Sequence, residues 1–357
     1  MNTKFIASYE PQGTNPDLRL VSGSVRAVHA SELLIRVVAT GICHTDLIFA
    51  TWPADQIPYP KVLGHEGAGV VVEAGPGVTK ARPGDFVLLS FHNCKDCHDC
   101  KEGHPSFCDK FVEINYGGED ATYTTEGTNL RGNFFGQSSF AELAVVKESS
   151  VVNVTDIIKT EEELKLFAPL GCGFQTGAAT VENVARANEK DRVAVIGLGG
   201  VGLVSIMTAK MQACETIIGI DRVPDRLELA KALGATHVIN TSDENIDMKG
   251  EIQRATDGRG SSITIDTTGN MGLIKAGLES TSNRGQLIFI GVPPLDAMMD
   301  LHLVTFMQVW THLRFFAIIK LIEIRLGKSF EERLKVMLSL PSIYPEWYSG
   351  IGKASYQ

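Results

Sequence analysis

Residues 193–202 read VAVIGLGGVG, an apolar run that passes directly into spaced glycines. This pattern is typical of a buried strand followed by the Gly-x-Gly-x-x-Gly turn that opens a helix. In such a turn Gly197 permits the tight bend, Gly199 lets the backbone approach a pyrophosphate, and Gly202 lets the helix pack on the strand. The positive N-terminus of the helix then faces the anion. The residues predicted to bind a dinucleotide here are Gly197, Gly199, Gly200, Val201 and Gly202.

The next apolar run, residues 216–220, ends in Asp221, 19 residues after Gly202. A carboxylate at this place accepts hydrogen bonds from the ribose hydroxyls of the cofactor and repels a 2′-phosphate. The expected cofactor is therefore NAD rather than NADP. Arg222 keeps NADP open as an alternative, because a guanidinium beside the ribose could accept that phosphate.

The sequence pattern around this motif differs between two parts of the chain. From about residue 190, strand patterns alternate with helical patterns, which indicates a doubly wound parallel sheet. Residues 33–89 instead contain short β-rich runs separated by glycine and proline turns at 75–77 and 82–85. That part predicts a compact β domain.

Length and composition limit the classes of function. With 357 residues, 44% of them hydrophobic, the chain has material for about two domains. It carries 33 Lys and Arg against 42 Asp and Glu, and this net charge of −9 argues against a nucleic-acid partner. The first residues lack the apolar core of a secretory signal, and no apolar run reaches the ~20 residues that span a bilayer. We expect a soluble, cytoplasmic protein with no membrane partner.

Four of the seven cysteines lie close together, with the spacing Cys-x₂-Cys-x₂-Cys-x₇-Cys. Four thiolates saturate a tetrahedral Zn²⁺ and leave no position for a substrate, as in structural zinc sites. Disulfides are less expected in a reducing compartment. An iron–sulfur cluster also uses four cysteines, but the charged residues between these ones indicate an exposed loop and favour zinc. The predicted ligands of the structural zinc are Cys94, Cys97, Cys100 and Cys108.

Two further cysteines and a histidine could form a second metal site. Cys43 lies in the stretch GICHTD, Cys172 in PLGCG and His65 in GHEG. Two thiolates and one imidazole leave the fourth position of Zn²⁺ open, as catalytic sites require. The seventh cysteine, Cys214, lies on the apolar face of a predicted helix and is interpreted as a small core residue.

At these residues the chain resembles the zinc-dependent medium-chain alcohol dehydrogenase family. The run GHE-x₂-G-x₅-G at 64–75, the four-cysteine segment and the glycine turn occur in the order and spacing of that family. The resemblance extends over roughly residues 5–305. Within the family, the segments 135–141 and 169–177 are most similar to the aryl (benzyl) alcohol dehydrogenase branch.

The resemblance implies an α/β plus β architecture. Residues 1–160 would form a GroES-like β-barrel catalytic domain with a structural zinc lobe at about 92–110, and residues 161–308 an NAD-binding Rossmann domain. It also implies two zinc ions per chain and hydride transfer between an aryl or allylic primary alcohol, or its aldehyde, and NAD(H). The alternative is an NADPH-using aldehyde reductase on the same fold. Relatives commonly dimerise, so a homodimer or homotetramer is expected.

The resemblance also assigns roles around the second metal site. Cys43, His65 and Cys172 would hold the catalytic zinc. Glu66 would lie behind the metal, and Asp46 would orient His65 from outside the ligand shell.

The proton path and part of the cofactor site are implied next to these ligands. Thr45 would take the proton of the substrate alcohol, and His44 would lie near the cofactor pyrophosphate. Many family members pass the proton on to a histidine three residues further along, where this chain has Ile48. Water or His44 would then release the proton. Four nearby aromatic residues could line a substrate pocket or belong to the core: Phe49, Trp52, Phe91 and Phe140.

The resemblance fades from Val309 onward, so residues 309–357 form an atypical C-terminal segment. Residues 309–338 show helical periodicity, whereas the family completes its cofactor sheet here and returns to the catalytic domain. A retained intron or a frameshift in the gene model is one explanation. If the ending is real, the last strands of the sheet would be missing or replaced, and the enzyme could be catalytically impaired.

Overall fold

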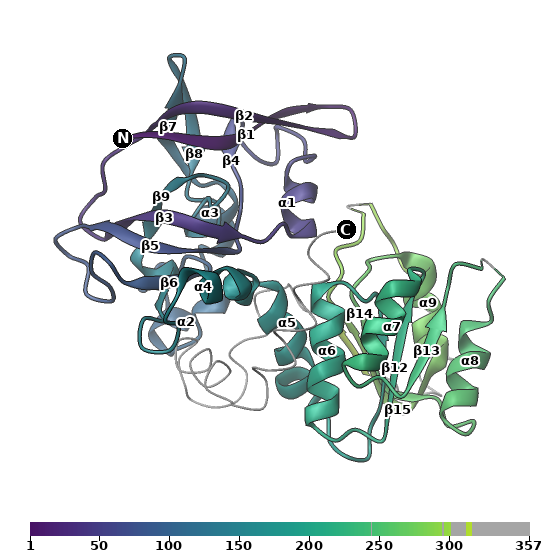
Figure 1. Cartoon of the computed structure of the whole chain (residues 1–357). Helices are drawn as coiled ribbons and strands as arrows, with labels where there is room; N and C mark the ends of the chain where they lie inside the picture. The colour runs from purple at the N-terminus through teal and green to yellow at the C-terminus, as the bar shows by residue number, and fades with distance from the viewer. Residues whose placement is uncertain (244, 295, 301–311, 316–357) are drawn as a thin grey trace. The chain divides into compact units, whose positions relative to one another are not determined.

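The computed structural model describes residues 1–243, 245–294, 296–300 and 312–315 (Figure 1). The chain divides into two compact units, the first running to Gly173 and the second beginning at Phe174. The first unit continues past residue 160, the expected end of the catalytic domain, because helix α4 (Glu161–Phe167) packs on strands of that unit. Among the described residues, no helix is long and apolar enough to cross a membrane.

The first unit contains a closed barrel with the strand order β1-β2-β7-β8-β4. Neighbouring strands are antiparallel, except for a short parallel contact between β4 and β8. The barrel strands are β1 (Asn2–Gln12), β2 (Asn15–Val25), β4 (Lys61–Val62), β7 (Glu119–Thr125) and β8 (Thr128–Gly132).

A five-stranded antiparallel sheet with the order β10-β6-β5-β3-β9 completes the β structure of this unit. Alternate residues such as Leu33 and Ile35, or Val87 and Leu89, enter one common core. The residues between them, Leu34 and Leu88, are also buried, so the sheet is covered on both faces at these positions. The β-rich runs predicted between residues 33 and 89 belong to this sheet. Its strands are β3 (Glu32–Thr40), β5 (Gly67–Ala74), β6 (Phe86–Leu89), β9 (Leu143–Lys147) and β10 (Val151–Asn153).

Short helices connect these strands. Thr160 caps α4, because its hydroxyl oxygen accepts a hydrogen bond from the backbone N–H of Glu163 at 3.2 Å. The other helices are α1 (His44–Phe49), α2 (His98–Lys101), α3 (Phe111–Tyr116) and the 3₁₀ turns η1 (Pro105–Phe107), η2 (Phe134–Gly136), η3 (Glu148–Ser150) and η4 (Ala168–Gly171).

The second unit is a six-stranded sheet with the order β13-β12-β11-β14-β15-β16, in which every neighbouring pair is parallel. From β11 the next strands along the chain are added on one side of the sheet, and from β14 on the other side, as in doubly wound dinucleotide-binding sheets. The doubly wound sheet predicted from the sequence is therefore confirmed. Its strands are β11 (Arg192–Ile196), β12 (Thr216–Asp221), β13 (His237–Asn240), β14 (Ser261–Asp266), β15 (Thr281–Phe289) and β16 (His312–Phe315).

Helices cover both faces of this sheet (Figure 1). Val193 and Val195 of β11 pack in one core with α6 and α7, whereas Ala194 and Ile196 pack on the opposite side with α8 and α9. Burial on both faces explains why β11 is a continuous apolar run. The helices are α5 (Gly173–Ala179), the π-helix η5 (Thr180–Ala185), α6 (Gly200–Met211), α7 (Pro224–Ala232), α8 (Met248–Ala255) and α9 (Met271–Ser280).

Strand β16 corrects the helical reading of residues 309–338 in one place. His312–Phe315 pairs in parallel with residues 286–289 of β15 and adds a strand to the sheet after Val309. Pairing with an existing strand overrides local periodicity, because it satisfies the backbone hydrogen bonds of an otherwise open edge. The remaining predictions for residues 301–311 and 316–357 fall outside the described residues.

Candidate metal and dinucleotide sites

Three separate segments of the first unit bring four metal-binding side chains together. Cys43 immediately precedes α1, His65 and Glu66 lie between β4 and β5, and Cys172 follows η4. The ligand atoms of all four residues lie within 4.8 Å of one another. The three ligand positions expected for a catalytic metal are therefore neighbours in space, with a carboxylate beside them.

Asp46, on the first turn of α1, contacts two of the segments that form this cluster. Its Oδ1 atom accepts from the backbone N–H of Gly64 at 3.0 Å and lies 2.9 Å from His65 Nδ1. Its Oδ2 atom accepts from the backbone N–H of Cys43 at 3.1 Å. One carboxylate thus orients the imidazole and also fixes the backbone beside two of the three ligand residues.

The other ring nitrogen of His65 supplies a test of whether a metal fits. His65 is 2% exposed, and its Nε2 atom has no hydrogen-bond partner among the described residues. A buried polar atom without a partner is costly, so its presence needs an explanation. Two sulfurs within reach of this nitrogen form a donor set that suits Zn²⁺. The residues present fit the metal.

Two thiols and a carboxyl group compete for protons in this cluster. The hydrogen bond between the two thiols lowers the pKa of Cys43 well below its usual range and raises that of Cys172 well above it. Burial raises the pKa of Glu66 to about 8. A divalent cation between the ligand atoms would replace these protons with fixed positive charge.

Glu66 is held by the backbone around it. The backbone N–H of Gly173 donates to Glu66 Oε1 at 2.9 Å. A Cβ atom at Gly41 would come within 1.9 Å of Glu66 Oε2, so only glycine leaves room for the carboxylate there.

Thr45 and His44 occupy consecutive positions at the start of α1 but differ in exposure. Thr45 is buried, whereas His44 is exposed and its side chain forms no hydrogen bond within the part of the chain that the structure describes. Phe49, also on α1, stacks on Trp52 with a ring separation of 4.4 Å. The aromatic residues predicted near the metal segments thus include at least one closely packed pair.

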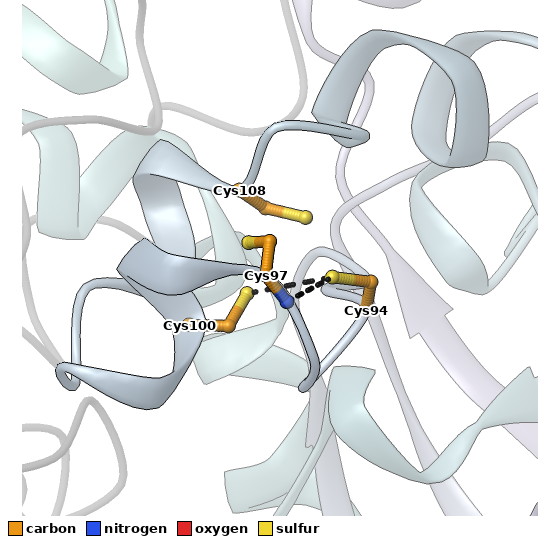
Figure 2. A group of neighbouring side chains, drawn as sticks. All are labelled: Cys94, Cys97, Cys100 and Cys108. Atoms are coloured by element: carbon orange, nitrogen blue, oxygen red, sulfur yellow. Dashed lines mark hydrogen bonds between the residues drawn. The ribbon is translucent and has the colours of Figure 1, made fainter.

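The four-cysteine cluster is a separate site in the same unit (Figure 2). Its four sulfur atoms lie within 4.8 Å of one another, and the Sγ atoms of Cys94 and Cys100 are 3.9 Å apart. Cys97 precedes α2 and Cys108 follows η1, so two short helices turn the chain around one point. A Cys₄ set of this kind could bind a structural zinc.

Backbone N–H groups favour the thiolate form of one member of this cluster, Cys94, whereas burial raises the pKa values of Cys100 and Cys108. Asp96 and Cys97 donate to the sulfur of Cys94 at 3.4 and 3.3 Å. Desolvation opposes ionisation, but these bonds lower the pKa of Cys94 to about 6. A thiolate is the form that binds a metal.

The glycine turn of the second unit has the geometry that its motif predicts. Gly197 has φ +88°, and a Cβ atom there would lie 2.5 Å from Thr267 Oγ1. A Cβ atom at Gly202 would lie 1.9 Å from the carbonyl oxygen of Gly197. At Gly199, by contrast, a Cβ atom would meet no described atom within 4 Å. This open space beside the first N–H groups of α6 fits a phosphate group.

Asp221 ends β12 next to this turn. Its Oδ2 atom accepts from the backbone N–H of Leu198 at 2.7 Å, and its Oδ1 atom from that of Val223 at 2.9 Å. Arg226 Nη1 lies 3.6 Å from Oδ2, whereas Arg222 is exposed and forms no ion pair among the described residues. The arginine that reaches Asp221 is therefore not the one adjacent in sequence.

Comparison with known proteins agrees with this geometry. Residues 29–156 match the alcohol dehydrogenase GroES-like domain, and residues 200–317 match the zinc-binding dehydrogenase domain. The chain is 38% identical over 261 residues to a probable alcohol dehydrogenase of Pseudomonas sp, covering 72% of this chain and 81% of that protein. The chain belongs to the zinc-binding medium-chain alcohol dehydrogenase family. Its expected family and fold class are confirmed.

Two further members of this alcohol dehydrogenase family have named substrates. A geraniol dehydrogenase of Castellaniella defragrans is 37% identical, with 74% of this chain and 70% of that protein covered. The crystal structure of benzyl alcohol dehydrogenase from Acinetobacter calcoaceticus has a TM-score of 0.81 and 31% identity, and covers 97% of this chain and 91% of the other.

Sequence reasoning missed several residues that surround these sites. Gln137 bonds to the backbone of the His65 segment, Thr267 donates to the glycine turn, and Arg226 faces Asp221. Gln137 belongs to a stretch that resembles the family, but its partners are about 50 to 70 positions away in the sequence, so local pattern could not assign it a role.

Proposed function

We propose that this member of the family is a zinc-dependent alcohol dehydrogenase that uses NAD(H). The observation that carries the proposal is the buried Nε2 atom of His65. It has no hydrogen-bond partner in the described part of the chain and belongs to one cluster with the sulfurs of Cys43 and Cys172. Such a set binds Zn²⁺ with one position left open for a substrate oxygen.

Zinc would supply a Lewis acid that lowers the pKa of the alcohol, and NAD⁺ would accept the hydride. Within the chain, Cys43, His65 and Cys172 would hold the metal, and Asp46 would keep the His65 ring in place. Thr45 would accept the hydroxyl proton of the alcohol. Because Ile48 offers no proton acceptor, the proton would leave through water or His44.

The second unit would bind the cofactor through the glycine turn and Asp221. The open space at Gly199 would take the pyrophosphate, with Gly200 and Val201 presenting N–H groups of the first turn of α6. Asp221 would accept hydrogen bonds from the ribose hydroxyls. The lone pairs of its carboxylate oxygens that do not bond to the N–H groups of Leu198 and Val223 would be used for this. The carboxylate would disfavour a 2′-phosphate, so NAD is proposed over NADP.

We propose a primary alcohol with an aryl or allylic group as the substrate. Relatives at 37% and 31% identity are named for geraniol, an allylic alcohol, and benzyl alcohol, an aryl alcohol. The cysteine cluster of Cys94, Cys97, Cys100 and Cys108 would hold a second, structural zinc. A cytoplasmic homodimer or homotetramer remains the expected state.

The test is nicotinamide absorbance on purified protein given benzyl alcohol or geraniol, with NAD⁺ and NADP⁺ in parallel. Turnover with NAD⁺ that stops on zinc chelation and returns on zinc addition supports the proposal. Preferred use of NADP⁺ would favour the aldehyde reductase. Protein that retains zinc at both sites but oxidises neither alcohol would contradict the proposed substrate class.

A further inference from the structure

The segment of residues 133–138, between β8 and β9, has an unusual backbone. Four of its residues have positive φ: Asn133 at 60°, Phe135 at 51°, Gly136 at 70° and Ser138 at 53°. Residues other than glycine rarely adopt this conformation, which persists only where surrounding contacts impose it. The contacts of this segment therefore indicate what it is shaped to hold.

Gln137 lies in the middle of this segment and is fully buried. Its Oε1 atom accepts from the backbone N–H of Gly67 at 3.0 Å. Its Nε2 atom donates to the carbonyl oxygens of His65 and Ser90, both at 2.8 Å. One side-chain amide thus bonds to the backbone on both sides of Glu66. It also links this backbone to Ser90, the residue that follows β6.

Other residues of this segment, and Ser139 just after it, bond to or contact the stretch from Val62 to His65. Ser138 Oγ donates to the carbonyl oxygen of Val62 at 2.6 Å, and the backbone N–H of Ser139 donates to that of Gly64 at 3.0 Å. The ring of Phe135 lies 4.8 Å from the imidazole of His65. The backbone from β4 to β5 is therefore held at several consecutive points.

From these contacts we propose that Gln137 is a positioning residue for the zinc ligand His65. The inference rests on the proposed function, since it concerns the metal of that site. Asp46 orients the imidazole ring, whereas Gln137 fixes the backbone that carries it. Metal–ligand distances tolerate only ~0.2 Å of error, so backbone freedom at His65 would weaken the metal site. Buried carbonyls at His65 and Ser90 would also lose their donor.

The test is the release of zinc to a chromogenic chelator from Gln137→Met, a variant of similar volume without the amide. We expect the zinc ion at the His65 site to leave at least ~10-fold faster from the variant than from the parent protein. This is the effect typical of mutating residues that support metal ligands from outside the ligand shell. The other zinc ion should leave at the parent rate. Cobalt substituted at the faster site should show an altered absorption spectrum. Gln286→Met is the matched control, because Gln286 makes one bond to Ala185 in the second unit.

A milder variant, Ser138→Ala, removes the bond to Val62 and serves if Gln137→Met does not fold. We expect a smaller acceleration of the same single ion. Release at the parent rate, or equal acceleration of both ions, overturns the proposal. If the parent protein holds zinc only at the four-cysteine cluster, the proposed function fails and this inference with it. If the parent holds both ions, parent-like release in the variants refutes this inference alone.

Discussion

The Asp46 carboxylate lies 2.9 Å from Nδ1 of His65, and both side chains are buried. The same carboxylate also accepts from the backbone of Gly64 and Cys43. This sharing explains how two segments distant in sequence keep a thiol and an imidazole in register without a covalent link. The other imidazole nitrogen has no hydrogen-bond partner among the residues that the structure describes, so it is available to the proposed metal.

Asp46→Asn should weaken zinc binding at this site by ~10–100-fold. An amide retains one acceptor oxygen, so either the His65 ring or the Cys43 backbone loses its partner. Competition with a chelator of known affinity measures the effect. Asp55→Asn, at an exposed position, is the control, and equal affinities in the two variants would contradict the role of Asp46.

Thr45→Val should lower kcat by ~10²–10⁴-fold if the hydroxyl takes the substrate proton. Valine has nearly the same shape, so the packing of this buried position is kept. Thr45→Ser should restore most of the activity because it restores the hydroxyl. Steady-state kinetics with NAD⁺ and benzyl alcohol provide the measurement, and full activity in the valine variant would refute the relay.

Asp221→Asn should lower kcat/KM for NAD⁺ about tenfold, the loss expected from one hydrogen bond to a charged acceptor. Because the repulsion of a 2′-phosphate also disappears, kcat/KM for NADP⁺ should rise. The comparison is with Asp225→Asn, which removes an exposed charge at the start of α7. An unchanged ratio between the two cofactors would exclude Asp221 as the selecting residue.

If the proposed structural zinc is bound, Cys97→Ser should release roughly one zinc ion per chain and lower Tm, because the metal would stabilise the loop around α2. Alcohol turnover by the folded fraction should persist, since the other cluster keeps its ligands. Cys214→Ser, a buried cysteine outside both clusters, is the control and should keep the full zinc content. Metal analysis measures the zinc content of each variant, and thermal unfolding of the same samples measures Tm. Parent-like zinc content in Cys97→Ser would argue against this ligand assignment.

Acid stability should depend on Glu32, whose side chain is fully buried between Arg26 and Lys147. Burial opposes ionisation, but hydrogen bonds from both cations lower the pKa of Glu32 from 4.5 to about 2. A depressed pKa contributes stability that is present above pH ~4.5 and is lost as pH falls toward 2.

Glu32→Gln should therefore be less stable than the parent at pH 7, by on the order of 2 kcal/mol, and the difference should shrink between pH 5 and 3. Urea unfolding at each pH measures it. Glu73→Gln, at an exposed position, serves for comparison. A parent-to-variant difference that stays constant over this range would show that charge on Glu32 is not the cause.

Several features could be predicted because they depend on neighbours in the sequence. The strand, turn and helix around Gly197 are local, and so is the spacing that brings Cys94, Cys97 and Cys100 together. The strand at His312–Phe315 could not be predicted, because its stability comes from pairing with β15 rather than from its own periodicity.

The sequence by itself determined the family, the two-part architecture and the residue types able to bind zinc and a dinucleotide. Only the tertiary structure decided which atoms of those residues meet. It brought Cys43, His65 and Cys172 together from three segments, and it placed Gln137 against the backbone of His65. The reason is physical: local motifs arise from short-range backbone preferences, whereas a metal cluster depends on contacts between segments that only the packed core brings into register.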